Sequence, residues 1–394
     1  MKLLRVIASM DPVSGGPCQG IRNSIPEQEK LGVHNEVLCL DGPSASYLGK
    51  DNFPIQTLGP AENPWRYTKE FVPWLVNNLA QYDAVIVHGL WLFHGFAVLK
   101  ALKILRKKSP NKLPRFFVMP HGMLDPYFQK AEGRKLKALR NVLYWKFIES
   151  EVVNGADGVL FTCEQELLLA RKPFKPYRPK RELNIGYGVP APPGKSEAQI
   201  KAFQNICPGL NGASYILFLS RVHEKKGVDF LIQAYLNTKA QHPDLPIPKL
   251  VVAGPGMDTE YGGQLEKVAA GDPDILFPGM LSGDAKWGAF YGCEAFVLPS
   301  HQENFGIAVA EALACGKPVL ISDQVNIWRE IKEGGGGMVA PDTLEGTERL
   351  LMAWFEMEAE GKKDMGLNAR KVFEGKFSIG PAAQRMVEVI GDVI

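Results

Sequence analysis

Residues 299–318 read PSHQENFGIAVAEALACGKP, and they follow a short apolar run, 295–298, that is typical of a buried strand. Between Asn304 and Gly316 the only charged residue is Glu311, which stands among Ala, Val, Ile and Leu. A carboxylate on an otherwise apolar helix is unfavourable to bury without a partner, and the hydroxyl groups of a ligand would supply one. The alternative is a glutamate that faces solvent on a half-exposed helix.

A second carboxylate, Glu303, stands just before this predicted helix. The helix is expected to open at Asn304, Phe305 and Gly306, whose N–H groups would be free to bind phosphate. Eight helical residues rise about 12 Å, so Glu303 and Glu311 could contact opposite ends of a long ligand, with its phosphates between them.

Outward from this stretch, short β-type runs alternate with helical segments, a pattern typical of parallel α/β sheets. The predicted strands are Leu3–Ala8, Glu36–Leu40, Ala84–His88, Phe116–Met119, Gly158–Thr162, Tyr215–Ser220, Leu250–Ala253, Ile275–Phe277, Ala295–Leu298 and Pro318–Ile321. Three prolines and three glycines within 186–194 mark a linker. We therefore expect an α/β protein with two Rossmann-like domains, 1–189 and 195–377, that face each other across a cleft. The helix expected over 378–394 could belong to either body and pack back on the first domain.

Other loops at strand ends carry candidate binding residues. Gly15 and Gly16 stand between the first strand and a helix, where glycine lets a phosphate approach the backbone; an ordinary glycine turn is the alternative. Arg221 and Lys226, in SRVHEKKG after a predicted strand, could both face a diphosphate, although basic loops are usually solvated. His121 follows another strand beside a glycine; a single histidine is more often structural than catalytic, but this position in a facing cleft is better placed than most.

Metal and dinucleotide sites are not indicated. His88 and His94 lack further ligands that would match a zinc site, and Asp272-Pro273-Asp274, although a literal DxD, lies in a Gly/Pro turn. Neither a GxGxxG nor a Walker motif follows the first strand. We expect no metal and no cofactor.

The charges are unevenly distributed. The 394 residues carry a net charge of +2, yet residues 100–182 hold 19 Lys and Arg against 8 Asp and Glu. Within this block, 134–150 is the best helix; Leu136, Leu139, Leu143 and Phe147 form its expected core-facing stripe, with Trp145 opposite and close to Arg134. A basic face with an exposed aromatic suits an anionic membrane or a lipid-diphosphate acceptor, and a solvated helix face is an equal alternative. Nucleic-acid binding is not favoured, because no such motif is present.

The six cysteines show no CxxC spacing and are expected to be buried thiols. The apolar run at the N-terminus is too short for a signal peptide, and no stretch is long enough to span a membrane. The sequence favours a cytoplasmic location, with a peripheral position at the inner face of the plasma membrane as an open alternative.

Together these motifs resemble the retaining glycosyltransferases of family 4, which have the GT-B fold and include enzymes of bacterial polysaccharide and lipopolysaccharide assembly. The resemblance rests on the E-x7-E element of Glu303 and Glu311, on SRVHEKKG, on the GGP loop and on the HG at 121. Residues 41–83 and 171–212 do not match recognisably.

The resemblance implies a role for each matching residue. Arg221 and Lys226 would bind the donor diphosphate and stabilise the leaving nucleotide, and Glu303 would contact hydroxyls of the donor sugar. The N–H groups of Asn304, Phe305 and Gly306 would bind the sugar and the phosphates, and Glu311 would bind the ribose. His121 would lie near the reacting sugar, and Gly15 and Gly16 would lie near the phosphates.

The implied reaction moves a hexose from a nucleotide sugar to a glycan or lipid-linked acceptor without a metal. UDP-glucose is the first candidate for the donor, with other UDP-hexoses or GDP-mannose close behind, and the acceptor is undetermined. A nucleotide-sugar epimerase or hydrolase of the same fold, and a non-catalytic nucleotide-sugar-binding protein, remain alternatives.

Overall fold

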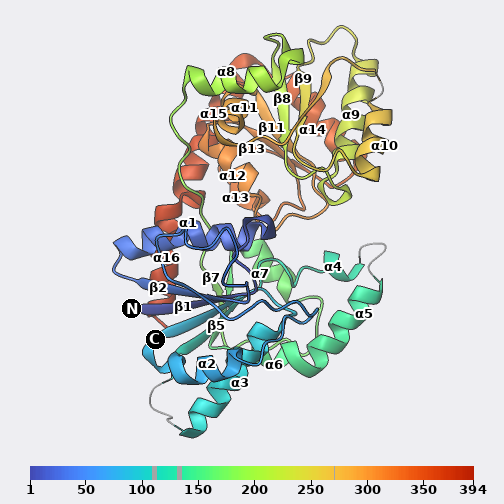
Figure 1. The fold of residues 1–394 in the computed structure, drawn as a ribbon. Coiled ribbons are helices and arrows are strands. Elements are labelled where there is room, and N and C mark those ends of the chain that lie inside the picture. Colours follow the sequence, from blue (N-terminus) through green and yellow to red (C-terminus); the bar gives the residue numbers. More distant parts are fainter. Residues whose placement is uncertain (109–112, 131–134, 270) are drawn as a thin grey trace. The chain divides into compact units, whose positions relative to one another are not determined.

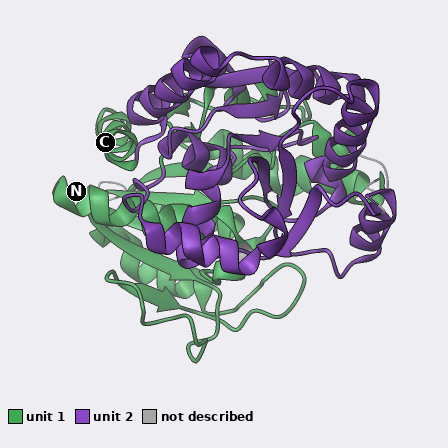
Figure 2. Cartoon of the chain, turned by 90° about the horizontal axis from the view of Figure 1, so that it is seen from above, with its two compact units in different colours: residues 1–188, 379–394 green, residues 189–378 purple. Residues whose placement is uncertain are grey.

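The chain forms two compact units in a computed structural model that describes residues 1–394 except 109–112, 131–134 and 270. Unit 1 comprises residues 1–188 and 379–394, and unit 2 comprises 189–378 (Figure 2). The α/β class with two parallel sheets is confirmed, because every described strand pair is parallel.

Within the described residues, unit 1 contains a seven-stranded sheet in the order β3-β2-β1-β4-β5-β6-β7 (Figure 1). Its strands are β1 (Lys2–Ile7), β2 (His34–Cys39), β3 (Ile55–Thr57), β4 (Ala84–His88), β5 (Arg115–Met119), β6 (Gly158–Phe161) and β7 (Glu182–Asn184). Its helices are α1 (Gly16–Lys30), α2 (Phe71–Asn78), α3 (Phe93–Lys108), α4 (Tyr127–Lys130), α5 (Lys135–Tyr144), α6 (Ser150–Gly155), α7 (Glu164–Ala170) and α16 (Ile379–Gly391).

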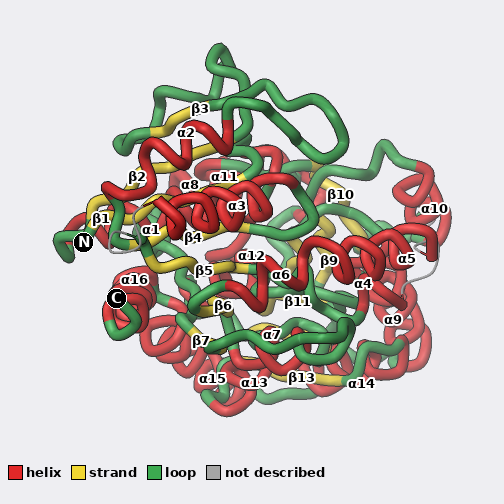
Figure 3. Tube along the Cα trace, turned by 90° about the horizontal axis from the view of Figure 1, so that it is seen from below, coloured by secondary structure: helices red, strands yellow, loops and turns green. Residues whose placement is uncertain are grey.

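Both faces of this sheet are covered, so its central strands are mostly apolar, and the exceptions, Arg5 in β1 and His88 in β4, are buried polar residues. Successive residues of β4 alternate between two cores: Val85 and Val87 pack with α2 and α3, which lie side by side (Figure 3). Ala84 and Ile86 pack on the other side in a cluster that includes Met386 of α16. Helix α16 lies beside α1 and completes this second core, so residues from the two ends of the described chain share one hydrophobic layer.

Unit 2 contains a six-stranded sheet, within the described residues, in the order β10-β9-β8-β11-β12-β13. Its strands are β8 (Tyr215–Leu219), β9 (Lys249–Ala253), β10 (Ile275–Gly279), β11 (Ala295–Leu298), β12 (Val319–Ser322) and β13 (Gly337–Ala340). Its helices are α8 (Glu197–Ile206), α9 (Val228–Gln241), α10 (Glu260–Val268), α11 (Gly283–Gly292), α12 (Ile307–Ala314), α13 (Trp328–Glu333), α14 (Leu344–Phe355) and α15 (Ala359–Val372). Strands β8 and β11 are neighbours, so the loops that follow them meet at one sheet edge.

The basic helix is turned the other way from its predicted orientation. The residues predicted to face the core are the exposed ones: Leu136, Leu139, Leu143 and Phe147, here called the α5 stripe, are each at least half exposed, and Leu136 reaches 84%. Trp145, predicted on the outer face, is only 1% exposed. Arg134, its expected neighbour, lies outside the described residues.

The helix has this orientation because its buried residues contact other segments of unit 1, and helical periodicity in the sequence does not reveal such contacts. The buried positions are Asn141, Trp145 and Glu149, and the helix widens into a π-helical turn over Trp145–Glu149. The Trp145 ring stacks on Phe174 at 5.0 Å between centroids, and the Glu149 carboxylate accepts a hydrogen bond of 3.1 Å from the N–H of Trp91. The Trp145 ring and the hydrogen-bonded Glu149 carboxylate therefore determine which face of the helix is buried, and the leucines lie on the exposed face.

Five of the six cysteines are buried and Cys315 is partly buried; all six are free thiols. Among the described residues, none of the helices combines the length and the apolar character needed to cross a bilayer.

Candidate functional site

The buried Lys226 forms an ion pair with the partly buried Glu303 at the edge of the unit 2 sheet where the strands end. The Lys226 ammonium contacts Oε2 of Glu303, and the lysine is 7% exposed. Burial of Glu303 opposes its ionisation, but the charge of Lys226 and its hydrogen bond outweigh burial and lower the pKa of the carboxyl. The Glu303 carboxylate is therefore ionised at neutral pH and held in contact with the Lys226 ammonium.

Gly227 brings the two loops together. Its φ of +64° is in the left-handed region, and a Cβ at this position would stand 2.1 Å from the carbonyl oxygen of Pro299. Any other residue would force the Lys226 loop away from the loop after β11, so glycine is required here for a steric reason.

Glu303 is held by its backbone as well. Its N–H donates to the carbonyl of Gln324 at 2.9 Å, and its carbonyl accepts from the N–H of Asn326 at 2.9 Å. The loop after β11 is therefore tied to the loop after β12, and the carboxylate of Glu303 has a rigid base.

The helix after Glu303 begins later than predicted. Helix α12 begins at Ile307, because Gly306 adopts a left-handed conformation with φ 80° and stands at its N-cap. The N–H of Asn304 donates to Oε1 of Glu303 at 3.1 Å, and the Phe305 ring packs edge-on against Phe377 at 5.6 Å. The prediction that Asn304 opens the helix with a free N–H is therefore wrong, since that N–H caps the neighbouring carboxylate.

Glu311 is partly buried among its apolar neighbours, and its partner belongs to the protein. Lys286 of α11 lies 2.6 Å from Oε1, and the Glu311 side chain is 14% exposed. Burial raises the pKa of Glu311, and Lys286 opposes that shift. The sequence argument that a ligand hydroxyl must compensate this carboxylate was therefore incomplete. Lys286, a single cation in an otherwise apolar part of its helix, was the signal for this partner.

Arg221 shares the loop of Lys226 but not its burial. It stands two residues after β8 and is exposed, while the next residue, Val222, is buried and donates its N–H to the carbonyl of Pro255 at 2.8 Å. The loop thus presents an exposed cation, Arg221, a partly buried one, Lys225, and a buried one, Lys226.

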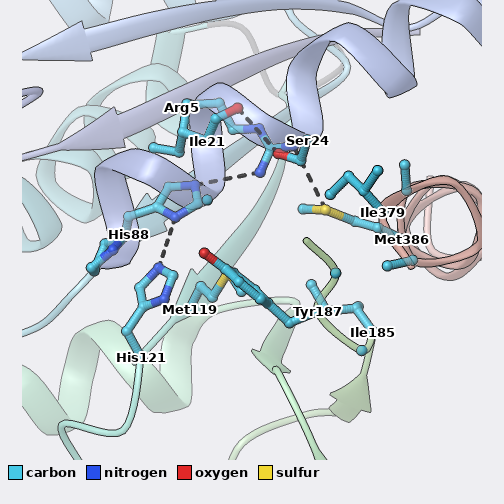
Figure 4. A pocket seen from close by; sticks show the side chains of 16 residues that line it. Arg5, Ile21, Ser24, His88, Met119, His121, Ile185, Tyr187, Ile379 and Met386 are labelled. Atoms are coloured by element: carbon cyan, nitrogen blue, oxygen red, sulfur yellow. Dashed lines mark hydrogen bonds between the residues drawn. The ribbon is translucent and has the colours of Figure 1, made fainter. Parts of the chain in front are cut away.

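In unit 1, the predicted glycine loop stands at the start of α1. Gly15 has φ +84° and is the N-cap, and α1 begins at Gly16. The carbonyl of Gly16 accepts a hydrogen bond of 3.1 Å from the Tyr187 hydroxyl. Tyr187 and His121 line the same cavity, which has a volume of about 30 Å³ (Figure 4).

His121 follows β5 in a left-handed conformation with φ 53°, which is unusual for a residue with a side chain. Its Nε2 lies 2.9 Å from Nδ1 of His88, as Figure 4 shows. Burial, together with the positive charge of Arg5, lowers the pKa of His121 to about 3. The next residue, Gly122, donates its N–H to Oε1 of Glu166 at 2.6 Å, which holds the loop in this conformation.

Sequence reasoning missed two residues of this cavity. It treated His88 as an ordinary polar residue at a strand end and did not single out Arg5. The available signal was an arginine in the middle of the apolar run LLRVI, since a charged residue in a buried strand requires specific partners.

The predicted site residues thus fall into two groups, and each group belongs to one unit. Gly15, Gly16 and His121 lie in unit 1, whereas Arg221, Lys226, Glu303, Asn304, Phe305, Gly306 and Glu311 lie in unit 2.

The DxD sequence has a structural role. Lys239 contacts Asp272 at 2.9 Å and Asp274 at 2.5 Å, and Lys249 lies 3.5 Å from Asp274. In the part of the chain that the structure describes, no group of three or more His, Cys, Asp or Glu side chains is placed to hold a metal ion.

Two family models match the chain: a glycosyl transferase 4-like domain over residues 15–187, and glycosyl transferases group 1 over 208–372. An uncharacterized glycosyltransferase of Methanocaldococcus jannaschii is 30% identical over 179 residues, 44% of each chain. A D-inositol 3-phosphate glycosyltransferase of Corynebacterium urealyticum is 24% identical over 360 residues, 83% of this chain and 78% of that protein. Other curated relatives with the same name are matched over about a third of their length.

The solved structure of HepE from Anabaena in complex with UDP aligns with the whole of both chains, with a TM-score of 0.73 and 18% identity. At this identity the likeness shows the fold. The two family models cover most of the chain, one in each unit. The chain therefore belongs to the family-4 type of glycosyltransferases and has their GT-B fold.

Proposed function

We propose that the protein transfers a hexose from a nucleotide sugar, with UDP-glucose as the first candidate, to a hydroxyl group of a glycan or glycolipid acceptor. The observation that carries this proposal is the buried pair of Lys226 and Glu303 at the end of β11. Family membership supports it, and so does the structural likeness to HepE, whose solved structure contains UDP.

In the proposed reaction, negative charge grows on the donor diphosphate as its bond to the sugar breaks. Lys226 and Arg221 stabilise that charge, and preorganised cations are most effective where burial lowers the local dielectric. Glu303 has two tasks: it holds the Lys226 ammonium in place before the donor arrives, and it accepts hydrogen bonds from sugar hydroxyls.

The other predicted residues bind the donor in this scheme. Glu311 accepts hydrogen bonds from the ribose through the oxygen that Lys286 leaves available, and the loop of Asn304, Phe305 and Gly306 lies along the sugar and phosphates. His121 contacts the sugar, and Gly15 and Gly16 lie near the phosphates. The sugar gains oxocarbenium character, the acceptor attacks from the leaving-group face, and the configuration is retained without a metal.

The proposal is tested by a screen of UDP-, GDP- and ADP-sugars with and without EDTA. Saturating UDP-glucose is expected to raise the Tm by about 5–10 °C, because a ligand at about 100 times its Kd stabilises by about 2.7 kcal/mol. EDTA is expected to leave slow donor hydrolysis unchanged. A larger shift with a GDP- or ADP-sugar would reassign the donor, and loss of turnover in EDTA would contradict the metal-free mechanism.

We further propose that the enzyme acts in exopolysaccharide or lipopolysaccharide biosynthesis as a peripheral protein at the inner face of the plasma membrane. The support is the α5 stripe, whose exposed apolar side chains stand among the exposed cations Lys135, Lys137, Arg140 and Lys146. An apolar stripe flanked by cations suits a surface of anionic lipid. In this proposal the contact is made by leucines and a phenylalanine, because Trp145 is buried.

Membrane binding is measured by co-sedimentation with liposomes at physiological salt. The protein is expected to bind vesicles rich in anionic lipid and not neutral ones, and the triple variant Leu136→Ser, Leu139→Ser, Phe147→Ser is expected to bind at least about 10-fold more weakly. The control carries Met280→Ser and Leu367→Ser, two exposed apolar residues of unit 2, and should bind like the wild type. Equal binding of the triple variant would rule out the α5 stripe as the contact.

A further inference from the structure

Arg5 places a positive charge in the interior of unit 1, and among the described residues no carboxylate pairs with it. The residue is 1% exposed, and all its side-chain acceptors in the described part of the chain are uncharged. They are Oδ1 of Asn35 at 3.1 Å, Oε1 of Gln28 at 2.6 Å, Nε2 of His88 at 3.4 Å and Sδ of Met386 at 3.6 Å. Burial lowers the pKa of Arg5 to about 9, so the guanidinium stays charged at neutral pH.

A buried cation without a counter-charge is unfavourable unless hydrogen bonds satisfy it. Its acceptors come from β2, α1, β4 and α16, which enclose it from several sides. One of them, His88, leads directly to His121, because Nδ1 of His88 lies 2.9 Å from Nε2 of His121 (Figure 4). The three side chains form one continuous chain of hydrogen bonds.

We propose that Arg5 and His88 are positioning residues that hold His121 as a neutral imidazole with its proton on Nδ1. A guanidinium can only donate, so Nε2 of His88 must accept. A neutral imidazole has one proton, so in His88 that proton is on Nδ1 and is donated to Nε2 of His121. His121 then carries its own proton on Nδ1. This inference rests on the proposed function in one respect, namely that His121 contacts the donor sugar.

The groups around the two rings keep them neutral. The charged or titratable groups that face them are Arg5 from β1, His94 from α3 and Tyr187 from the segment after β7. Burial, then His121, Arg5 and His94, lower the pKa of His88 well below its usual value. None of these neighbours is an anion that would favour a second proton on either ring.

The consequence concerns the chemistry that His121 can perform. With Nε2 accepting from His88 and Nδ1 protonated, the ring has no lone pair to act as a base and no labile second proton to act as an acid near neutral pH. It can donate one hydrogen bond, from Nδ1, to an oxygen of a bound sugar. Its position is fixed at both ends, by His88 at the ring and by the bond from Gly122 to Glu166 at the backbone.

The tautomer is read directly by NMR, without any donor. In the full chain with 15N-labelled histidine, long-range proton–nitrogen spectra are expected to show His121 protonated on Nδ1 and unchanged over about pH 5.5–8.5, the range in which an ordinary histidine titrates. A proton on Nε2, or a titration of His121 in that range, would overturn the proposal whether or not the enzyme transfers glucose.

Variants separate the positioning role from a structural one. His88→Leu should leave His121 as a mixture of tautomers and lower kcat about 10- to 100-fold, since a ring in the wrong tautomer cannot make its hydrogen bond. His88→Asn keeps an amide donor in place of Nδ1–H and should restore the tautomer and most of kcat. Arg5→Met, which removes the cation, should also release the tautomer.

His94→Leu is the matched control, because His94 is equally buried and its Nε2 contacts the backbone carbonyl of His88, outside the chain to His121. It should change stability and leave the His121 tautomer as in the wild type. If the His121 tautomer changed equally in His94→Leu and His88→Leu, the hydrogen-bonded network would contribute only packing and no specific positioning. If His88→Leu gave a mixed tautomer and full kcat, the tautomer of His121 would have no role in the reaction. Absence of transfer with every donor would instead reject the proposed function, while the NMR result still decides the tautomer.

Discussion

Lys226→Ala is expected to lower kcat about 1,000-fold and to change the Kd of the nucleotide sugar less than about threefold. The ammonium is buried and held by Glu303, so its interaction is largest when charge has accumulated on the leaving diphosphate. An interaction that strengthens only toward the transition state appears in kcat and not in ground-state affinity. Steady-state kinetics with an independent measurement of donor binding gives both values.

Two further variants test whether Lys226→Ala acts through the lost ammonium or through damage to the loop. Removing Lys226 leaves Glu303 as a buried, uncompensated charge, which could lower activity by damaging the loop. In the double variant Lys226→Ala, Glu303→Gln that charge is gone, so stability should return. Because Glu303 is itself assigned to the donor sugar, this variant tests the effect on stability and not the effect on kcat. Lys225→Ala, at the neighbouring lysine, should stay within about threefold of the wild type. An unchanged kcat with weakened donor binding in Lys226→Ala would refute the assigned role.

The second large effect is on stability. Trp145→Ala is expected to lower the free energy of unfolding by about 3–5 kcal/mol, the usual cost of removing a large, fully buried aromatic side chain. The ring is stacked on Phe174 and lies 6.4 Å from the Trp91 ring, so its loss leaves a cavity that these rigid neighbours cannot fill. Urea denaturation, monitored through the unfolding transition of unit 1, measures this loss in the free energy of unfolding.

Leu136→Ala, on the α5 stripe, is the comparison. Leu136 is 84% exposed, so the change should stay within about 0.5 kcal/mol. If the orientation predicted from helical spacing were correct, the result would be reversed, with the leucine costly and the tryptophan neutral.

The central strands of both sheets were predictable from sequence, whereas three edge strands were not. The strands β4 and β11 have the predicted bounds, because both are short apolar runs, interrupted only by His88 at the end of β4, and are buried on both faces. The missed strands are β3, β7 and β13, of three or four residues each, and all stand at the edges of their sheets. Edge strands are only partly buried, so their composition does not separate them from loops.

Some candidate residues stand out in the local sequence. Glu311 is the lone carboxylate of an apolar helix, and Lys226 belongs to a cluster of cations after a strand. What could not be predicted were partners that only the fold supplies: Lys286 for Glu311, and Arg5 with His88 for His121. These partners are distant along the chain, up to 83 residues in the case of Arg5 and His88, and no periodic pattern connects them.

The packing of α16 in unit 1 has a consequence for the order in which the protein folds during its synthesis. Domains generally fold as they emerge from the ribosome, with the N-terminal one first. Here residues 189–378 can close their core while unit 1 still lacks Met386, Ile390 and Val393. The second unit along the sequence is therefore complete before the first, and the interior around Arg5 stays open on one side until residues 379–394 have been made.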